Sequence, residues 1–278
     1  RPLAVGEHRA EAFQQLAYLA PFDTDGATKV FRLRAAPVQW EVSPGVTKQA
    51  FAFNGVIPGP VIRVNEGDQV RIIVDNALPE ATTVHWHGMI LPNAQDGVPG
   101  LTQDAIPPGG TFTYEFTAVA PGTHWYHPHM GGAQVGKGLF GALEVVPRSG
   151  EIVADGDYRI MINDGALGFT FNGRSWPATR TLAAKVGERV RIRLVGTGPE
   201  QSHSFHLHGQ PFQVVAQDGR KLAQPYAVDT LLVSPGQTFD VVTIPQNPGK
   251  WLMHCHIFSH AEGPDGMLGM AAVLEVSP

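Results

Sequence analysis

Short apolar runs recur along the whole chain at the spacing of β-strands. The segments QVRIIVDN, TFTYEFTA, RVRIRLVG and TFDVVTIP alternate or run apolar over five to eight residues, and Gly, Pro, Asn or Asp bounds them. Alternation with a period of two and turn residues at both ends is typical of strands. Many such strands in succession predict an all-β fold built from Greek-key sandwiches or barrels.

The same order of strand segments and motifs occurs twice along the chain. FNGVIPGPVIRVNEGDQVRIIV returns as FNGRSWPATRTLAAKVGERVRIRLV, and HWHG returns as HLHG. PGGTFTYEF at 108 returns as PGQTFDVVT at 235, and PGTHWYHPH at 121 returns as PGKWLMHCH at 248, both at an offset of 127 residues. A shared offset predicts two homologous domains. We place them at residues 24–147 and 158–278, with a polar linker at 148–157.

One segment before the repeat has a different period. Residues 7–20, EHRAEAFQQLAYLA, carry apolar residues near helical spacing, which predicts a short helix. We assign it to an N-terminal arm of residues 1–23 and expect it to pack against a neighbouring part of the protein.

Composition narrows the class of protein. With 43% apolar and 16% charged residues, the chain matches a soluble globular protein. A net charge of −5 without a basic run argues against nucleic acid or an anionic membrane as partner. No apolar run approaches the roughly 18 residues of a membrane span. No signal peptide is visible, and we interpret the opening RPLAVG, which lacks Met, as processed or trimmed.

The histidines are clustered. Ten of the twelve fall in HWH at 85–87, HPH at 127–129, HSFHLH at 203–208 and HCHIFSH at 254–260. Residues i and i+2 of a strand share a face, so each HxH presents two imidazoles side by side. Such pairs at matching positions of both repeats predict metal binding. The single cysteine, Cys255, excludes an internal disulfide and a Cys₄ zinc site.

The donor types point to copper. Magnesium and calcium prefer oxygen ligands, whereas imidazole suits copper, zinc, iron or nickel. Two His and one Cys with a weak axial Met identify a blue-copper site. Cys255 with His203 and His260 supplies this set, and Met267 or Met270 is the candidate axial ligand.

Four motifs then carry a family resemblance. HWHG, HPH preceded by WY, HSFHLHG, and HCHIFSH followed by GM resemble, in this order, the four copper-binding motifs of multicopper oxidases. The stretch DGVPGLTQDAIPPGG at 96–110 is also similar to the family's segment after its first motif. The resemblance implies two cupredoxin-like domains, about four coppers per chain and O₂ as co-substrate.

The resemblance also implies which residues bind each copper. They are His203, Cys255, His260 and an axial Met for type 1, His85 and His206 for type 2, and His87, His127, His129, His208, His254 and His256 for type 3. The family's axial residue usually stands ten positions after the cysteine, which is Asp265 here. Because AEGPDGM looks like a two-residue insertion, we favour Met267, with Met270 as the alternative.

Aligning the repeats places the mononuclear copper in domain 2 only. Cys255 corresponds to Pro128, His203 to Thr82 and His260 to Ala133, so domain 1 lacks these ligands. Copper nitrite reductases carry their cysteine ligand in the first domain, which makes nitrite reduction the weaker alternative. His124 aligns with Trp251 and is interpreted as a structural or channel-lining residue.

The HCH triplet implies an electron route. Cys255 points to one face of its strand, and His254 and His256 point to the other. By the resemblance, electrons taken singly at type 1 copper pass through these residues, and four of them reduce O₂ to water. We predict that Asp96 assists proton delivery; the alternative is an Asx-turn before Gly97.

The resemblance and the dispersed methionines favour a laccase, which oxidises phenols or aromatic amines. The alternatives are a metallo-oxidase for cuprous or manganous ions and a copper-binding module without turnover. Two-domain members of the family are similar in forming homotrimers, so we expect trinuclear clusters between domain 1 and domain 2 of neighbouring chains. We also expect a secreted or periplasmic location.

Overall fold

The computed structural model describes residues 18–278. The predicted N-terminal helix lies outside this range except for its last three residues. Those residues are not helical, because Leu19 forms a bridge with Val61 and the amide of Ala20 donates to the Val61 carbonyl. No helix within residues 18–278 is long and apolar enough to cross a bilayer.

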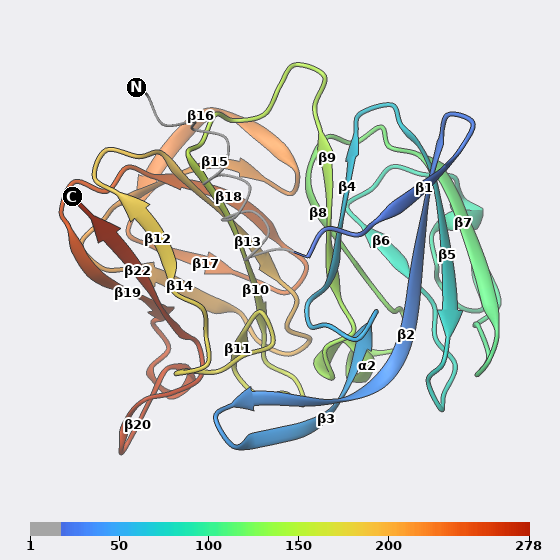
Figure 1. The fold of residues 1–278 in the computed structure, drawn as a ribbon, viewed down its shortest axis with the longest axis horizontal. Helices are drawn as coiled ribbons and strands as arrows, with labels where there is room; N and C mark the ends of the chain where they lie inside the picture. Colours follow the sequence, from blue (N-terminus) through green and yellow to red (C-terminus); the bar gives the residue numbers. More distant parts are fainter. Residues whose placement is uncertain (1–17) are drawn as a thin grey trace, which may run out of the picture.

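The first half of the chain forms two facing sheets (Figure 1, right). One sheet has the order β1-β2-β5-β7, with β3 also paired to β2, and the other has the order β4-β9-β8-β6. The bounds are β1 Phe22–Asp25, β2 Thr28–Ser43, β3 Val46–Phe53, β4 Gly59–Asn65, β5 Gln69–Asn76, β6 His85–His87, β7 Thr111–Thr117, β8 Gly122–His127 and β9 Gly141–Val146. A 3₁₀ turn, η1 Asn93–Gln95, and a short helix, α2 Gly132–Gly136, lie in the connections.

The second half repeats this plan (Figure 1, left). Its sheets have the orders β11-β10-β13-β18-β15-β16 and β12-β22-β19-β14-β17, and β20 pairs with β21. The bounds are β10 Gly156–Asn163, β11 Thr170–Phe171, β12 Leu182–Lys185, β13 Val190–Gly196, β14 His203–Leu207, β15 Phe212–Gln217, β16 Arg220–Val228, β17 Thr230–Val233, β18 Thr238–Thr243, β19 Gly249–Cys255, η2 Phe258–His260, β20 Glu262–Gly263, β21 Gly266–Met267 and β22 Ala271–Ser277.

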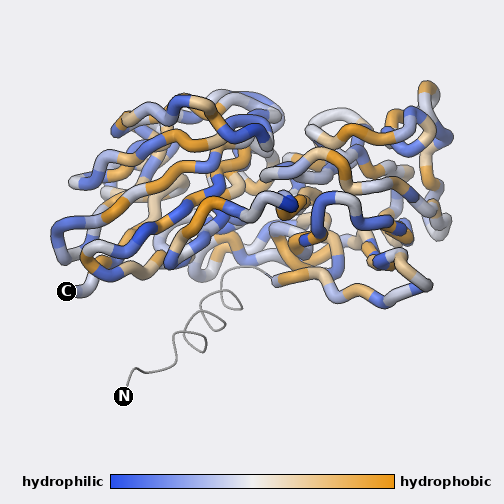
Figure 2. The backbone as a smooth tube through the Cα atoms, turned by 90° about the horizontal axis from the view of Figure 1, so that it is seen from above, coloured by the Kyte–Doolittle hydropathy of each residue, from blue (hydrophilic) through white to orange (hydrophobic). Residues whose placement is uncertain are grey.

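Strand alternation builds the two cores. In β5 the buried positions are Val70, Ile72, Val74 and Asn76, and the residues between them are partly exposed. Each half has its own apolar cluster of buried residues, and Figure 2 shows hydrophobic positions alternating with polar ones along the strands of both halves. The predicted fold of two cupredoxin-like β-sandwiches is confirmed.

The repeat extends to backbone details. In the two FNG turns, Asn54 and Asn172 both have φ of 53°, a left-handed conformation that Asn tolerates better than most residues. Both halves also contain the same parallel pairings, β2 with β5 and β10 with β13. The first half ends its last strand at Val146 and the second begins at Gly156, so the segment between them falls largely within the predicted linker.

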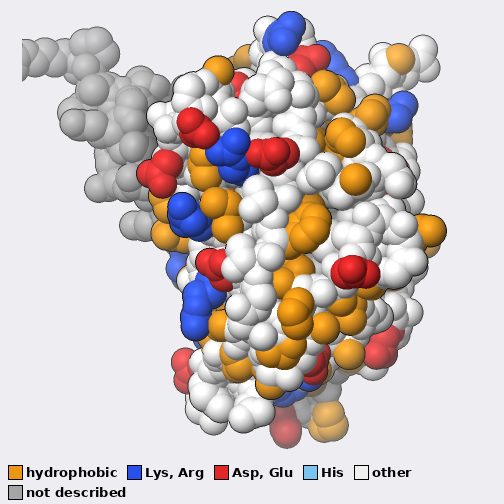
Figure 3. Space-filling model, turned by 90° about the vertical axis from the view of Figure 1, so that its right-hand side faces the viewer, with side chains coloured by type: hydrophobic (Ala, Val, Ile, Leu, Met, Phe, Trp, Pro, Cys, Tyr) orange, Lys and Arg blue, Asp and Glu red, His pale blue; other side chains and the backbone are white. Residues whose placement is uncertain are grey.

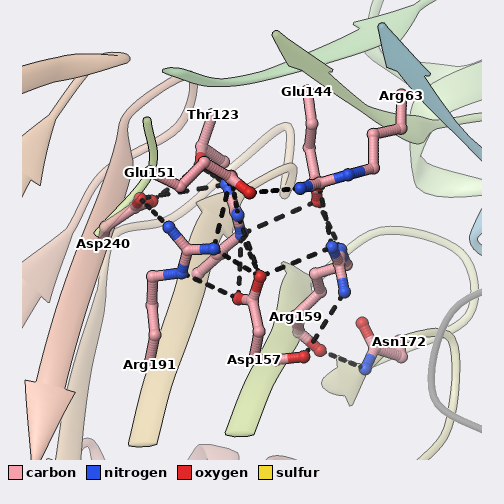
Figure 4. A network of polar contacts seen from close by, with 10 residues as sticks. Arg63, Thr123, Glu144, Glu151, Asp157, Arg159, Asn172, Arg191 and Asp240 are labelled. Atoms are coloured by element: carbon pink, nitrogen blue, oxygen red, sulfur yellow. Dashed lines mark hydrogen bonds and ion pairs between the residues drawn. The ribbon is translucent and has the colours of Figure 1, made fainter. Parts of the chain in front are cut away.

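A buried ionic network joins the two halves (Figure 4). Glu144 of β9 accepts hydrogen bonds from Arg63 at 2.5 Å and from Arg159 of β10 at 2.8 Å. Arg193 of β13 pairs with Asp157 at 2.9 Å. An apolar cluster from both halves lies in the same contact region.

Two further contacts of the network cross between β-sheets of different halves. Thr123 of β8 donates to Asp240 of β18 at 2.7 Å and accepts from Arg193 at 2.8 Å. Arg191 also pairs with Asp157 at 2.5 Å. Buried charges paired in this way fix the partners in position, because separating them leaves a charge in an apolar interior.

We predict that Glu144→Gln destabilises the protein. Burial alone would raise the pKa of Glu144, but the charges of Arg159 and Arg193 hold that pKa far below its ordinary value. Removing the carboxylate charge leaves the buried guanidinium groups of Arg159 and Arg193 with one counter-charge fewer, which costs about 3–5 kcal/mol of unfolding free energy. Chemical denaturation at neutral pH measures this difference.

The pH dependence follows from the same pKa. Because the folded-state pKa is depressed, the carboxylate stabilises the protein above its unfolded-state pKa of about 4.3, and this stability is lost as the pH falls below that value. The gap between the parent and Glu144→Gln should therefore narrow in acid. Glu275→Gln, in an exposed pair 4.0 Å from Lys250, is the control and should change little. Equal losses in both variants would contradict this account.

Candidate metal centres

Three soft or borderline donors converge inside domain 2. Pairing of β14 with β19 sets Phe205 opposite Cys255, and the turn η2 brings His260 back toward the same place. Sγ of Cys255 lies 3.5 Å from Nδ1 of His260 and 3.8 Å from Nδ1 of His203. The two Nδ1 atoms are 3.2 Å apart, and all three residues are buried. This trio is the predicted mononuclear site.

The free ring nitrogen of His203 faces a carboxylate. Nε2 of His203 is 3.3 Å from Oδ2 of Asp164, whose side chain is fully buried. Burial lowers the pKa of His203, but hydrogen bonding to Asp164 and to Cys255 raises it above its ordinary value overall. Burial raises the pKa of Asp164, and the contact with His203 more than offsets this. With its proton on Nε2, toward this carboxylate, His203 would keep Nδ1 available to a metal.

The two candidate axial methionines differ in position. Met267 is 42% exposed on the β20–β21 hairpin, opposite Glu262. Met270 is fully buried in the same apolar core as Cys255, and its carbonyl accepts the Cys255 amide at 3.0 Å. Extending the β19–β22 register places Met270 across from Cys255, on the same face. The geometry thus favours the alternative ligand, Met270, over the predicted Met267.

Four imidazoles lie on the other face of β14 and β19, two within the strands and two directly after them. His206 is opposite His254 in the β14–β19 register, and Nε2 of His208 lies 3.1 Å from Nε2 of His254. The ring of His256 is 5.4 Å from that of His206. Nδ1 of His206 donates to the carbonyl of Asp229 at 2.7 Å, which leaves Nε2 available as a ligand.

Domain 1 carries the matching quartet. His85 is opposite His127 in the β6–β8 register, and Nδ1 of His87 is 3.4 Å from Nε2 of His127. The ring of His129 lies 5.7 Å from that of His85. Burial lowers the pKa of His87 to about 4 and that of His127 to about 3. Both imidazoles are therefore neutral near pH 7, the form that binds metals.

The two quartets do not meet within one chain. Each group of three donors that can hold a metal, among the described residues, is confined to one domain. The domain 1 histidines line a cavity of about 450 Å³ whose domain 2 wall consists of Thr197, Gly198, Pro199, Pro235 and Gly236. This wall contains no imidazole.

At the positions in domain 1 that correspond to the mononuclear trio of domain 2, polar side chains bond to one another instead. Thr82, the counterpart of His203, donates to the side-chain oxygen of Gln134 at 2.8 Å. The Gln134 amide in turn donates to Glu80 and to the carbonyl of Ala81, each at 2.8 Å. The structure thus explains how domain 1 closes this region without Cys and His.

Asp96 lies beside a predicted ligand. Its carbonyl accepts a hydrogen bond from Nδ1 of His85 at 2.8 Å, and its Oδ1 is 3.4 Å from the same nitrogen. The next residue, Gly97, has φ of 81°, and a Cβ there would lie 1.9 Å from the Val84 carbonyl. The segment therefore orients His85 tightly. Proton delivery by Asp96 stays a prediction.

Three further side chains lie near the domain contact or the mononuclear trio without belonging to a predicted ligand set. His124 is buried, its Nε2 donates to the Ala120 carbonyl at 2.9 Å, and its ring packs against Gly219 of domain 2, which supports a structural role. The sequence analysis missed Asp164 and Phe169, whose ring stacks on His260 with centroids 4.0 Å apart. Neither stands in a histidine motif, so no spacing signal marks them.

Comparison with known proteins gives one consistent family. Two family models, both described as multicopper oxidase, match residues 34–150 and 155–278. Laccase-1 of Botryotinia fuckeliana is 36% identical over 71% of this chain and 40% of its own length. Copper resistance protein A of Escherichia coli is 28% identical over 73% of this chain and 44% of its own length. The chain spans less than half the length of these two relatives.

Solved structures of shorter proteins match more completely. The blue copper oxidase of Nitrosomonas europaea superposes with a TM-score of 0.84 and 34% identity, covering 89% of this chain and 85% of that one. The multicopper oxidase mgLAC superposes with a TM-score of 0.83 and 34% identity, covering 90% and 86%.

We predict that Met270→Leu, and not Met267→Leu, alters the mononuclear site. In a site with two His and one Cys, the weak axial ligand tunes both the visible spectrum and the reduction potential. The Cu(II)-loaded protein should therefore show a shifted thiolate band and a shifted potential in Met270→Leu only. A shift confined to Met267→Leu would restore Met267 as the ligand.

Proposed function

The chain belongs to the multicopper oxidase family, and we propose that it is a laccase-type oxidase, which couples one-electron oxidation of phenols or aromatic amines to reduction of O₂ to water. One observation carries the proposal. Cys255 belongs to the mononuclear trio on one side of β19, and the adjacent His254 belongs to the histidine quartet on the other side. With copper bound in both places, Cys255 and His254 would connect the two centres through adjacent residues of one strand, the short route that electron transfer between them needs.

The donor sets fit copper. Sγ of Cys255 and Nδ1 of His203 and His260 would hold one copper, and the eight imidazoles of the two quartets would hold the others, about four per chain in all. Copper supplies the one-electron chemistry when it is bound. The protein's part is to orient the imidazoles. The carboxylate of Asp164 lies beside His203. The backbone carbonyls of Asp229 and Asp96 accept hydrogen bonds from His206 and His85.

We further propose that the chain works as a homotrimer. The domain 1 quartet needs a second quartet, and the domain 2 quartet of the same chain does not face it. A head-to-tail contact between domain 1 of one chain and domain 2 of the next supplies the missing half and closes into a ring. The quartet lies where the cavity shared with domain 2 opens, and the face of domain 1 that points away from domain 2 (Figure 3) carries hydrophobic side chains among charged ones with no histidine in view, so the contact would use the former side.

The choice of reductant separates laccase from metallo-oxidase. Six dispersed Met residues provide no Met-rich segment for cuprous ions, which favours phenols. The similarity to copper resistance proteins keeps a cuprous oxidase as the second candidate. The complete set of eight imidazoles disfavours a nitrite reductase. Secretion or export to the periplasm remains part of the proposal and rests on the family resemblance.

We predict that a simple phenol supports faster O₂ uptake than Cu(I) or Mn(II). An outer-sphere aromatic donor requires no binding site for a metal ion. An oxygen electrode measures the three rates under matched, air-saturated conditions, and Cys255→Ser provides the background. A kcat/KM for Cu(I) above that for the phenol would identify a metallo-oxidase instead.

The shared cluster predicts complementation between two inactive variants. His87→Ala removes an imidazole of the domain 1 quartet, and His208→Ala removes one of the domain 2 quartet. In mixed trimers from co-expression, about one quarter of the interfaces combine an intact domain 1 with an intact domain 2. Oxidase activity should return to about that fraction of the parent's activity.

Each variant expressed alone is the control and should be inactive. Clusters built within single chains would give no activity in the mixture, because every chain would then carry one defect. Light scattering of the parent should report a trimer.

A further inference from the structure

One loop contacts both imidazoles of the mononuclear trio. The β10–β11 loop, residues 164–169, begins with Asp164, whose Oδ2 lies 3.3 Å from Nε2 of His203. It ends with Phe169, whose ring stacks on that of His260 with centroids 4.0 Å apart and an interplanar angle of 20°. The side chains at the two ends of the loop thus contact both imidazoles of the trio.

The loop is fixed from both sides. Asp164 accepts the amides of Gln201 at 2.6 Å and Glu200 at 3.3 Å, so its carboxylate is aimed by domain 2 itself. On the other side, Nζ of Lys48 in domain 1 donates to the carbonyls of Ala166 and Leu167 at 3.1 and 3.0 Å. The loop therefore holds its position relative to the trio.

Within the trio and the loop, a reductant in solution can reach Phe169 but not the two buried imidazoles. His203 and His260 are only 1% and 3% exposed, so neither imidazole presents an edge to solvent. Phe169 is partly exposed and lies against the face of His260. Its ring therefore offers an accessible aromatic surface in direct contact with the buried His260.

We propose that residues 164–169 form the electron-uptake loop of the mononuclear site, with Phe169 as the surface on which aromatic reductants stack and Asp164 as a positioning residue for His203. This rests on the proposed oxidase function. A phenol on Phe169 loses one electron to the site through the Phe169–His260 stack and its hydroxyl proton to solvent. It leaves as a phenoxyl radical, and O₂ is the final electron acceptor.

Asp164 acts on the electron affinity of the site. Its buried negative charge, beside the distal nitrogen of a ligand, stabilises the more positive, oxidised state of the site relative to the reduced state. Removing that charge makes the site easier to reduce. Phe169 is neutral, so its replacement should leave the reduction potential in place and alter only the encounter with the reductant.

Phe169→Leu tests the stacking surface. The rate at which a phenol bleaches the visible band of the copper-loaded protein without O₂ measures electron uptake directly. Loss of an aromatic pair corresponds to a decrease of about 3- to 10-fold. Ferrocyanide, a non-aromatic outer-sphere donor, should bleach both proteins equally, and Phe169→Tyr should retain the rate with phenol. An unchanged phenol rate in Phe169→Leu would overturn the role of Phe169.

Asp164→Asn tests the positioning role, with Glu200→Gln as the matched control because Glu200 is exposed and equally charged. The reduction potential should rise in Asp164→Asn by about 59 mV, a tenfold change in the one-electron equilibrium, and stay unchanged in the control. No shift, or the same shift in both, would overturn the role of Asp164. Should Asp164→Asn fail to fold, Gly198→Ala displaces the same carboxylate, since its Cβ would lie 2.4 Å from Oδ1.

These measurements are independent of oxygen reduction. Bleaching by phenol without subsequent O₂ uptake would refute the proposed oxidase function and leave the loop's role intact. A site that ferrocyanide bleaches and phenol does not would refute the role of Phe169, while the potentials still decide the role of Asp164.

Discussion

The alternation of side chains along β19 is the constraint on which the rest of the structure depends. Successive residues of a strand point to opposite sides, so the Cys255 side chain enters the core of domain 2 while His254 joins the histidine quartet on the other face. The neighbouring β14 repeats the alternation with His203 and His206. The two candidate metal centres of domain 2 therefore lie on opposite faces of the same pair of strands.

This arrangement requires a rigid frame on both faces. On the Cys255 face, the loop 164–169 fits against both imidazoles and is itself held by domain 1 through Lys48. Between the domains, the buried network around Glu144 and Arg193 resists any separation of the halves. Because Lys48 of domain 1 bonds to the loop of domain 2, the relative position of the two domains also sets the position of the proposed electron-uptake loop.

The sequence predicted much of this because metal ligands are written in short motifs. The internal repeat and the period of two predicted the sandwich fold, HxH spacing indicated both quartets, and the set of one Cys and two further His residues indicated the trio. Spacing along the chain could not decide between the two candidate axial methionines, since the register of β22 against β19 is what places Met270 across from Cys255. Asp164 and Phe169 could not be found at all, because they approach the trio from a loop that precedes His203 by more than thirty residues.

The most direct test of the back-to-back arrangement is the copper content and visible spectrum of Cys255→Ser beside the parent protein. The account predicts the loss of about one copper per chain together with the intense visible band, while the copper of the two quartets is retained. Retention of the band, or loss of all the copper, would contradict it, because the trio and the quartets would then not be separate sites on two faces of one strand.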